Sequence, residues 1–83
     1  MQTAWLARLE AMFAAPQLDV QAALSLVSEI RKGAGNGSVR STAVRASEAL
    51  QAAVRFPAKK ANITMAKRQL EALRDALKLD TMS

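Results

Sequence analysis

The sequence contains no cysteine, no histidine and no tyrosine, and its 83 residues include only one tryptophan and two phenylalanines. Without cysteine and histidine, the chain cannot form disulfides, thiolate or imidazole metal sites, or a cysteine nucleophile. It also lacks the side chain that most often acts as a general base near neutral pH. The remaining polar residues form no set of nucleophile, base and orienting group. We therefore predict a protein that is not an enzyme and uses no metal or cofactor.

Long apolar runs are also missing. No segment approaches the roughly 20 apolar residues that span a bilayer. The N-terminal apolar run is interrupted by Arg8 and Glu10, which a signal peptide would not tolerate. We expect a cytoplasmic protein with no membrane span, folded as a single domain over residues 1–83.

Positive charge is concentrated in the middle of the sequence. Residues 1–30 carry one cation and three anions, and residues 69–83 carry two cations and three anions. Residues 31–68 carry one anion, Glu48, and nine cations, which gives this segment a net charge of +8. Such asymmetry predicts a polyanionic partner, which is nucleic acid, a membrane surface or an acidic protein; the alternative is a solvated surface that only keeps the protein in solution. We call these nine residues the central cations: Arg31, Lys32, Arg40, Arg45, Arg55, Lys59, Lys60, Lys67 and Arg68.

Alanine and leucine dominate the composition, which favours a helix wherever apolar residues recur with a period of 3.6. This period occurs four times. The first predicted helix covers Thr3 to Ala15, with Thr3 as its N-cap, and Pro16 stops it. The second follows the N-cap Asp19, and Gly33 takes the position just past its end, where a left-handed residue is favoured. The residues of these two helices that we expect to face the core are Trp5, Leu6, Leu9, Met12, Phe13, Val20, Ala23, Leu24, Val27 and Ile30.

The third and fourth predicted helices carry apolar residues at alternating spacings of three and four. Ser38 is the predicted N-cap of the third helix, which ends at Phe56 and Pro57. The fourth begins at Pro57 or Asn62 and ends near Leu79. Two such helices joined by a few residues form an antiparallel hairpin. The repeats are Val39, Ala43, Ala46, Leu50 and Ala53 in the third helix, and Ile63, Ala66, Leu70, Leu73 and Leu77 in the fourth.

These patterns together predict an all-α fold, a small bundle of four short helices built as two antiparallel helical hairpins. Trp5, Phe13 and Phe56 are the large side chains that we expect in its core. An alternative arrangement pairs two such chains in a homodimer, because isolated helical hairpins bury little apolar surface.

Helical spacing also predicts where the central cations point. Arg40, Arg45 and Arg55 lie opposite the apolar residues of the third helix, so they share its exposed face. The first carboxylate of the fourth helix is Glu71, so the N-terminal part of that helix carries cations only. In an antiparallel hairpin these cations lie near Arg55, while Arg40 lies near the preceding connector. We therefore expect one basic face on the third and fourth helices.

The connector "IRKGAGNGSVR", residues 30–40, places three glycines between cations. Backbone amides of a glycine-rich turn that leads into a helix can bind a phosphate. The order helix, "GAG", helix resembles the hairpin of helix-hairpin-helix DNA-binding motifs over residues 26–39, although Ala34 stands where a larger apolar residue is usual and "NG" is extra. The alternative is an ordinary connector between helices. The candidate phosphate loop consists of Gly33, Gly35, Gly37 and Ser38.

Two functions fit these features. The first is a small non-catalytic nucleic-acid-binding or regulatory protein that contacts the phosphate backbone through the basic face. The low aromatic content argues against stacking on single strands and favours a duplex. The second is a protein-binding adaptor, chaperone or inhibitor, of a kind that phages or plasmids carry, which docks through a helix face. An exposed patch containing Trp5, Met12, Phe13 or Met65 would favour this second function.

Overall fold

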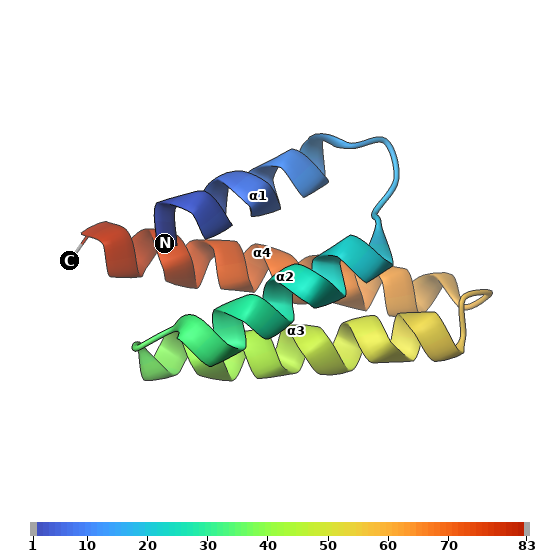
Figure 1. Ribbon diagram of the computed structural model, residues 1–83. Coiled ribbons are helices and arrows are strands. Elements are labelled where there is room, and N and C mark those ends of the chain that lie inside the picture. Colours follow the sequence, from blue (N-terminus) through green and yellow to red (C-terminus); the bar gives the residue numbers. More distant parts are fainter. Residues whose placement is uncertain (1, 83) are drawn as a thin grey trace.

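Four helices make up the computed structural model, which describes residues 2–82 and has no strand within that range. They are α1 (Gln2–Ala14), α2 (Val20–Gly33), α3 (Gly37–Arg55) and α4 (Lys60–Met82). Consecutive helices run in opposite directions (Figure 1). The prediction of an all-helical bundle of four helices is confirmed.

The helices are arranged in the ring α1, α2, α3, α4. Helix α3 packs closely along both α2 and α4, whereas α1 lies on α2 and α4 with less contact. The diagonal pairs, α1 with α3 and α2 with α4, do not touch along the described backbone. Because α2 has much more contact with α3 than with α1, these contacts do not single out the predicted division into two hairpins.

The alternating repeats of α3 and α4 form most of the core. All five predicted positions of α3 are buried, and so are four of the five in α4; Ile63 is only half-buried. Three of the α3 positions are alanines, whose short side chains allow α3 to approach its neighbours closely. The leucines supply the apolar area, each contributing about 1.5–3 kcal/mol when fully buried. Helix α2 adds Leu26, which the sequence pattern did not select.

Trp5 attaches α1 to α2. Its indole is 2% exposed, and its Nε1–H donates a hydrogen bond of 2.9 Å to Oε2 of Glu29. A guanidinium nitrogen of Arg8 donates to the same oxygen at 2.8 Å. One carboxylate oxygen on α2 thus satisfies two donors on α1, including the only polar atom of a buried aromatic side chain.

Gly33 provides the space that the indole needs. It is the last residue of α2 and, like every glycine in the described chain, has no positive φ. The prediction that it occupies a left-handed position past the helix end is therefore wrong; the C-cap is Ala34, in an extended conformation. A Cβ atom built on Gly33 would lie 3.0 Å from both Cζ2 and Cη2 of Trp5. Gly33 is exposed overall, but the indole lies on the side where a Cβ atom would stand, so any larger residue would press on Trp5.

Only one of the three predicted core aromatics is fully buried. Phe13 is half-buried, and its ring faces the guanidinium of Arg74, whose central carbon lies 5.2 Å from the ring centroid. Phe56 is 53% exposed, so the prediction that it is a core residue is wrong. It is the C-cap of α3 and lies outside the repeat that ends at Ala53, so its side chain extends beyond the packed layers.

We expect Gly33→Ala to lower the free energy of unfolding by about 1 kcal/mol. Overpacking a core contact costs about 1–3 kcal/mol, and the helix propensity of alanine returns only part of this, up to about 1 kcal/mol. Chemical denaturation followed by circular dichroism would measure the change. Gly37→Ala is the matched control, because nothing lies within 4 Å of its added methyl group. Equal effects of the two substitutions would contradict the assigned role of Gly33.

Candidate nucleic-acid interface

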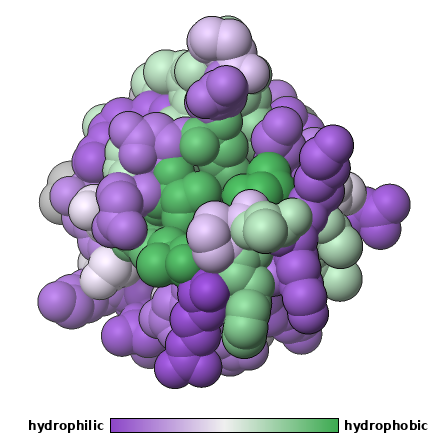
Figure 2. All heavy atoms as spheres, turned by 90° about the vertical axis from the view of Figure 1, so that its right-hand side faces the viewer, coloured by the Kyte–Doolittle hydropathy of each residue, from purple (hydrophilic) through white to green (hydrophobic). Residues whose placement is uncertain are grey.

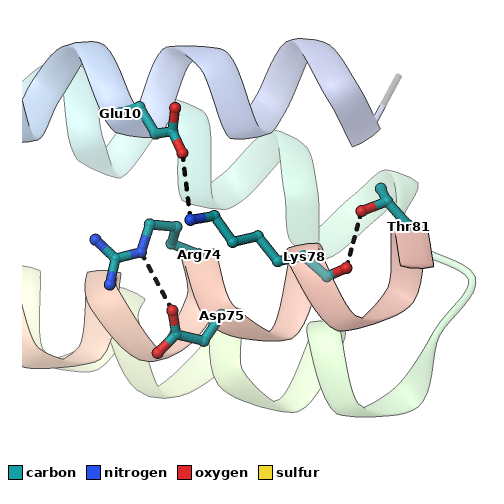
Figure 3. A network of polar contacts seen from close by, with 5 residues as sticks. All are labelled: Glu10, Arg74, Asp75, Lys78 and Thr81. Carbon is teal, nitrogen blue, oxygen red and sulfur yellow. Dashed lines mark hydrogen bonds and ion pairs between the residues drawn. The ribbon is translucent and has the colours of Figure 1, made fainter. Parts of the chain in front are cut away.

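The central cations are free of carboxylate partners. All nine are exposed, and within residues 2–82 none of them forms an ion pair. The three ion pairs of the described chain instead use the other three cations: Arg8 with Glu29, Arg74 with Asp75, and Lys78 with Glu10. Figure 3 shows the last two, with Lys78 reaching from α4 to Glu10 on α1.

Three of the arginines lie on the outer surface shared by α3 and α4. The side-chain amide of Asn62 donates to the carbonyl oxygen of Ala52 at 3.3 Å, which places Ala52 on the α4 side of α3. Arg45 precedes Ala52 by two helical turns and Arg55 follows it by three residues, so both project from this surface. Arg68 lies six residues after Asn62, on the adjoining outer side of α4. We call these residues the α3–α4 face; Lys59 adjoins it in the turn between the two helices.

Two lysines of α4 lie away from the α3–α4 face, on the side of α4 that is next to α1. Lys67 lines a groove of about 240 Å³ together with Met12, Phe13 and Leu18, so it faces α1 and the segment that follows it. Lys60 precedes Lys67 by two turns and lies along the same edge of α4. The sequence prediction placed both lysines on the same basic face as the α3 arginines, whereas the structure puts them around the side of α4.

The remaining central cations, Arg31, Lys32 and Arg40, lie at the opposite end of the bundle, next to the α2–α3 connector. Arg40 and Arg55 are separated by 15 residues of α3, which corresponds to about 22 Å along the helix axis. Arg45 lies between them, about 7.5 Å from Arg40 and about 15 Å from Arg55 along the axis. The cations of the α3–α4 face are therefore spread along α3, with Arg55 and Lys59 at the end that carries the α3–α4 turn.

The end of the bundle that carries the α3–α4 turn has an apolar centre. Figure 2 views this end directly: hydrophobic side chains gather in the middle, and hydrophilic side chains surround them. Apolar residues that belong to this end and are not fully buried include Leu18, Val54 and Phe56. The sequence analysis missed this exposed patch, because it assigned Phe56 to the core. The position of Phe56 outside the α3 repeat, directly before Pro57, was the signal that it does not face the core.

Two backbone amides at the start of α3 donate hydrogen bonds to a side chain of the glycine connector. The N-cap of α3 is Asn36, whose Oδ1 accepts from the backbone N–H groups of Ser38 at 2.8 Å and Val39 at 3.1 Å. The prediction of Ser38 as the N-cap is wrong. Asn36 also donates through Nδ2 to Oδ1 of Asp80 at 2.9 Å, which ties the connector to the end of α4.

These hydrogen bonds bear on the candidate phosphate loop. The amides at the start of a helix bind an anion only when they are unoccupied, and two of those in question already donate to Asn36. Gly33 is part of α2 and Gly37 is part of α3. We therefore leave Gly33, Gly35, Gly37 and Ser38 out of the proposed interface.

Other kinds of site find no support in the described residues. No group of three or more carboxylate side chains within residues 2–82 is placed to hold a metal ion. None of the four helices is long and apolar enough to cross a membrane. The chain matches no protein-family model, no curated protein and no solved structure.

We expect Asn36→Ala to lower the free energy of unfolding by about 1–2 kcal/mol, since it removes an N-cap together with the link to Asp80. Ser38→Ala should change it by less than about 0.5 kcal/mol, because the hydroxyl of Ser38 caps nothing. Thermal and urea unfolding of the two variants would compare them. A larger loss for Ser38→Ala would show that the serine, and not the asparagine, caps α3.

Proposed function

We propose that the protein binds the phosphate backbone of double-stranded nucleic acid, with the α3–α4 face as the main contact surface. The observation that supports this proposal most strongly is the division of the cations into two sets. Those outside residues 31–68 are used in ion pairs, whereas the nine inside are exposed and have no carboxylate partner among the described residues. Cations that are not neutralised within the molecule remain available to neutralise phosphates, and the release of counterions from the nucleic acid then favours binding.

The chemistry and dimensions of the surface agree with this function. Arg45, Arg55 and Arg68 each present a planar guanidinium that can bind a phosphate through two hydrogen bonds. The bundle is 39 Å long, which is close to one turn of B-form DNA, about 34–36 Å. A duplex lying along the bundle could therefore meet the α3–α4 face at one end and Arg40 at the other. Such contacts position a protein on a duplex without reading its sequence.

A second candidate function is docking to an acidic protein. It is favoured by Phe56 and Met65, which are 53% and 52% exposed beside the arginines of the α3–α4 face. Trp5 does not contribute to such a surface, because it is 2% exposed and packed against Gly33. Arginine, methionine and phenylalanine are enriched in protein interfaces, so the residue types of this surface also suit a protein partner. We prefer nucleic acid because residues 31–68 carry a net charge of +8, and interfaces with nucleic acid are much more positive than those between proteins.

We expect the affinity for a duplex of mixed sequence to fall steeply with salt, with a slope of log K against log salt of about −0.9 per phosphate contacted. Replacing Arg45, Arg55 and Arg68 together by glutamine should make this slope shallower by about 2 to 3. Fluorescence anisotropy with a labelled duplex between 50 and about 200 mM salt would measure both quantities.

The matched control replaces Arg8, Arg74 and Lys78 by glutamine, which also removes three positive charges but leaves the arginines of the α3–α4 face in place. Its salt slope should remain within about 1 of the wild-type value. Affinity that hardly changes with salt would contradict the proposal, as would equal effects of the two triple variants. Absence of duplex binding even at low salt would favour the acidic protein partner instead.

A further inference from the structure

We propose that the shallow hollow beside Phe56, at the C-terminal end of α3, binds one unpaired base where a nucleic-acid duplex ends or is interrupted. This inference rests on the proposed function and adds a preference that backbone contacts alone do not provide. The hollow has a volume of about 210 Å³. Its lining residues are Glu48, Gln51, Ala52, Arg55 and Phe56.

Phe56 is held in place while its ring stays accessible. Its backbone N–H donates to the carbonyl of Ala52 at 2.9 Å, and its own carbonyl accepts from the backbone N–H of Lys59 at 3.1 Å and from the side-chain amide of Asn62 at 3.5 Å. Pro57, the next residue, has a fixed φ. The side chain is nevertheless 53% exposed. An exposed aromatic ring on a fixed backbone is suited to stacking on a base, because the backbone that carries it is not ordered anew on binding.

The other walls of the hollow provide hydrogen-bonding groups for the edge of a base. The carboxylate of Glu48 can accept from an exocyclic amino group, and the amide of Gln51 can both donate and accept. Gln51 is already oriented by a weak bond from Nε2 to the hydroxyl of Ser47, at 3.4 Å. Arg55 lies on the same wall and can reach the phosphate that belongs to the stacked nucleotide.

Glu48 is otherwise difficult to explain. It is the single anion of residues 31–68, it is exposed, and it forms no ion pair with any described residue. On a surface that contacted only phosphates, this carboxylate would repel the ligand. Next to an aromatic ring and an amide, it can instead accept a hydrogen bond from the exocyclic amino group of a base that stacks on Phe56.

The charge around the hollow favours nucleic acid over an acidic peptide as its occupant. Arg55 lines the hollow, and the ammonium nitrogen of Lys59 is 5.2 Å from the centroid of the Phe56 ring. A lysine directly beside an aromatic ring is unusual at the centre of a protein interface, where lysine is depleted. Cations flanking a stacking ring are typical of surfaces that bind unpaired nucleotides.

Two DNA ligands test the inference. One is a covalently closed circular duplex, which has no end and no unpaired base and is called the sealed duplex. The other has the same sequence as a linear duplex, with an overhang of three nucleotides at one end that contains 2-aminopurine. We expect wild-type protein to bind the overhang ligand more tightly and to quench its 2-aminopurine fluorescence. Phe56→Ala should weaken binding to the overhang ligand by about 5- to 150-fold, the range that corresponds to the loss of one base–aromatic stack. Binding to the sealed duplex should stay unchanged.

Two further variants separate stacking from general effects. Phe56→Trp should retain the preference for the overhang and report stacking by quenching of its own fluorescence, whereas Phe56→Leu, which keeps an apolar side chain, should lose the preference. Glu48→Gln should strengthen binding to the sealed duplex and reduce the preference for the overhang. Circular dichroism would check that each variant is folded.

The outcomes distinguish this inference from the proposed function. Salt-dependent binding to the sealed duplex without any preference for the overhang would overturn the base-binding hollow and leave backbone binding intact. Equal weakening of both ligands by Phe56→Ala would also overturn it. Failure of the wild-type protein to bind either ligand would remove both proposals, and Phe56-dependent binding to an acidic peptide alone would assign the surface to a protein partner.

Discussion

The indole of Trp5 joins α1 to α2 by two contacts of different kinds. Its ring edge packs against the backbone of Gly33, and its nitrogen donates to the carboxylate of Glu29. Among the described side chains of α1, only Trp5 and Leu9 are buried, so the attachment of this helix depends on very few residues. Each contact needs the other: the glycine allows the ring to approach, and the carboxylate prevents the ring from burying an unsatisfied N–H group.

The position of α1 also decides which charges remain available. With α1 on α2 and α4, Glu29 receives Arg8 and Glu10 receives Lys78. Exposed ion pairs of this kind contribute little to stability, at most about 1 kcal/mol each. Their effect is on the distribution of charge, because carboxylates of the acidic first third neutralise cations outside residues 31–68. Arg45, Arg55 and Arg68 are left on the α3–α4 face, which α1 does not cover, whereas Lys67 lies in the groove beside α1.

Much of the fold could be predicted from the spacing of apolar residues, since a repeat of three and four marks one side of a helix whatever it packs against. The repeat positions are buried for this reason: they are Val39, Ala43, Ala46, Leu50 and Ala53 in α3, and Ala66, Leu70, Leu73 and Leu77 in α4. Features that depend on a second helix could not be predicted. Asn36 and Ser38 are both residue types that favour an N-cap position. The residue that caps α3 is Asn36, and its side chain also donates a hydrogen bond to Asp80, 44 positions away in the sequence. Gly33 was predicted to end α2 in a left-handed conformation, which is wrong; its role depends on the indole of α1, which the sequence of α2 does not reveal.

The candidate interface could be predicted in composition but not in arrangement. Charge counting selected the nine cations, and a helical wheel showed that they avoid the core of their own helix. A wheel cannot show which neighbour lies along each edge. The partners of α4 decide that Lys67 faces the α1 groove while Arg68, the next residue, belongs to the surface shared with α3. Phe56 was misplaced because hydrophobicity alone suggested burial, whereas the end of the repeat at Ala53 left no layer to receive it.

The residue composition of the α3–α4 face suits contacts made by long side chains. Alanines such as Ala49, Ala52 and Ala72 lie along its seam, so the surface between the helices is low, and arginine stems can lie over it while their guanidinium groups stay in water. Exposed charges interact over a Debye length of about 8 Å at physiological ionic strength, so a phosphate is held only where a side chain reaches it. Contacts of this kind position a phosphate backbone without reading its sequence. The hollow beside Phe56 adds a contact that can discriminate between ligands.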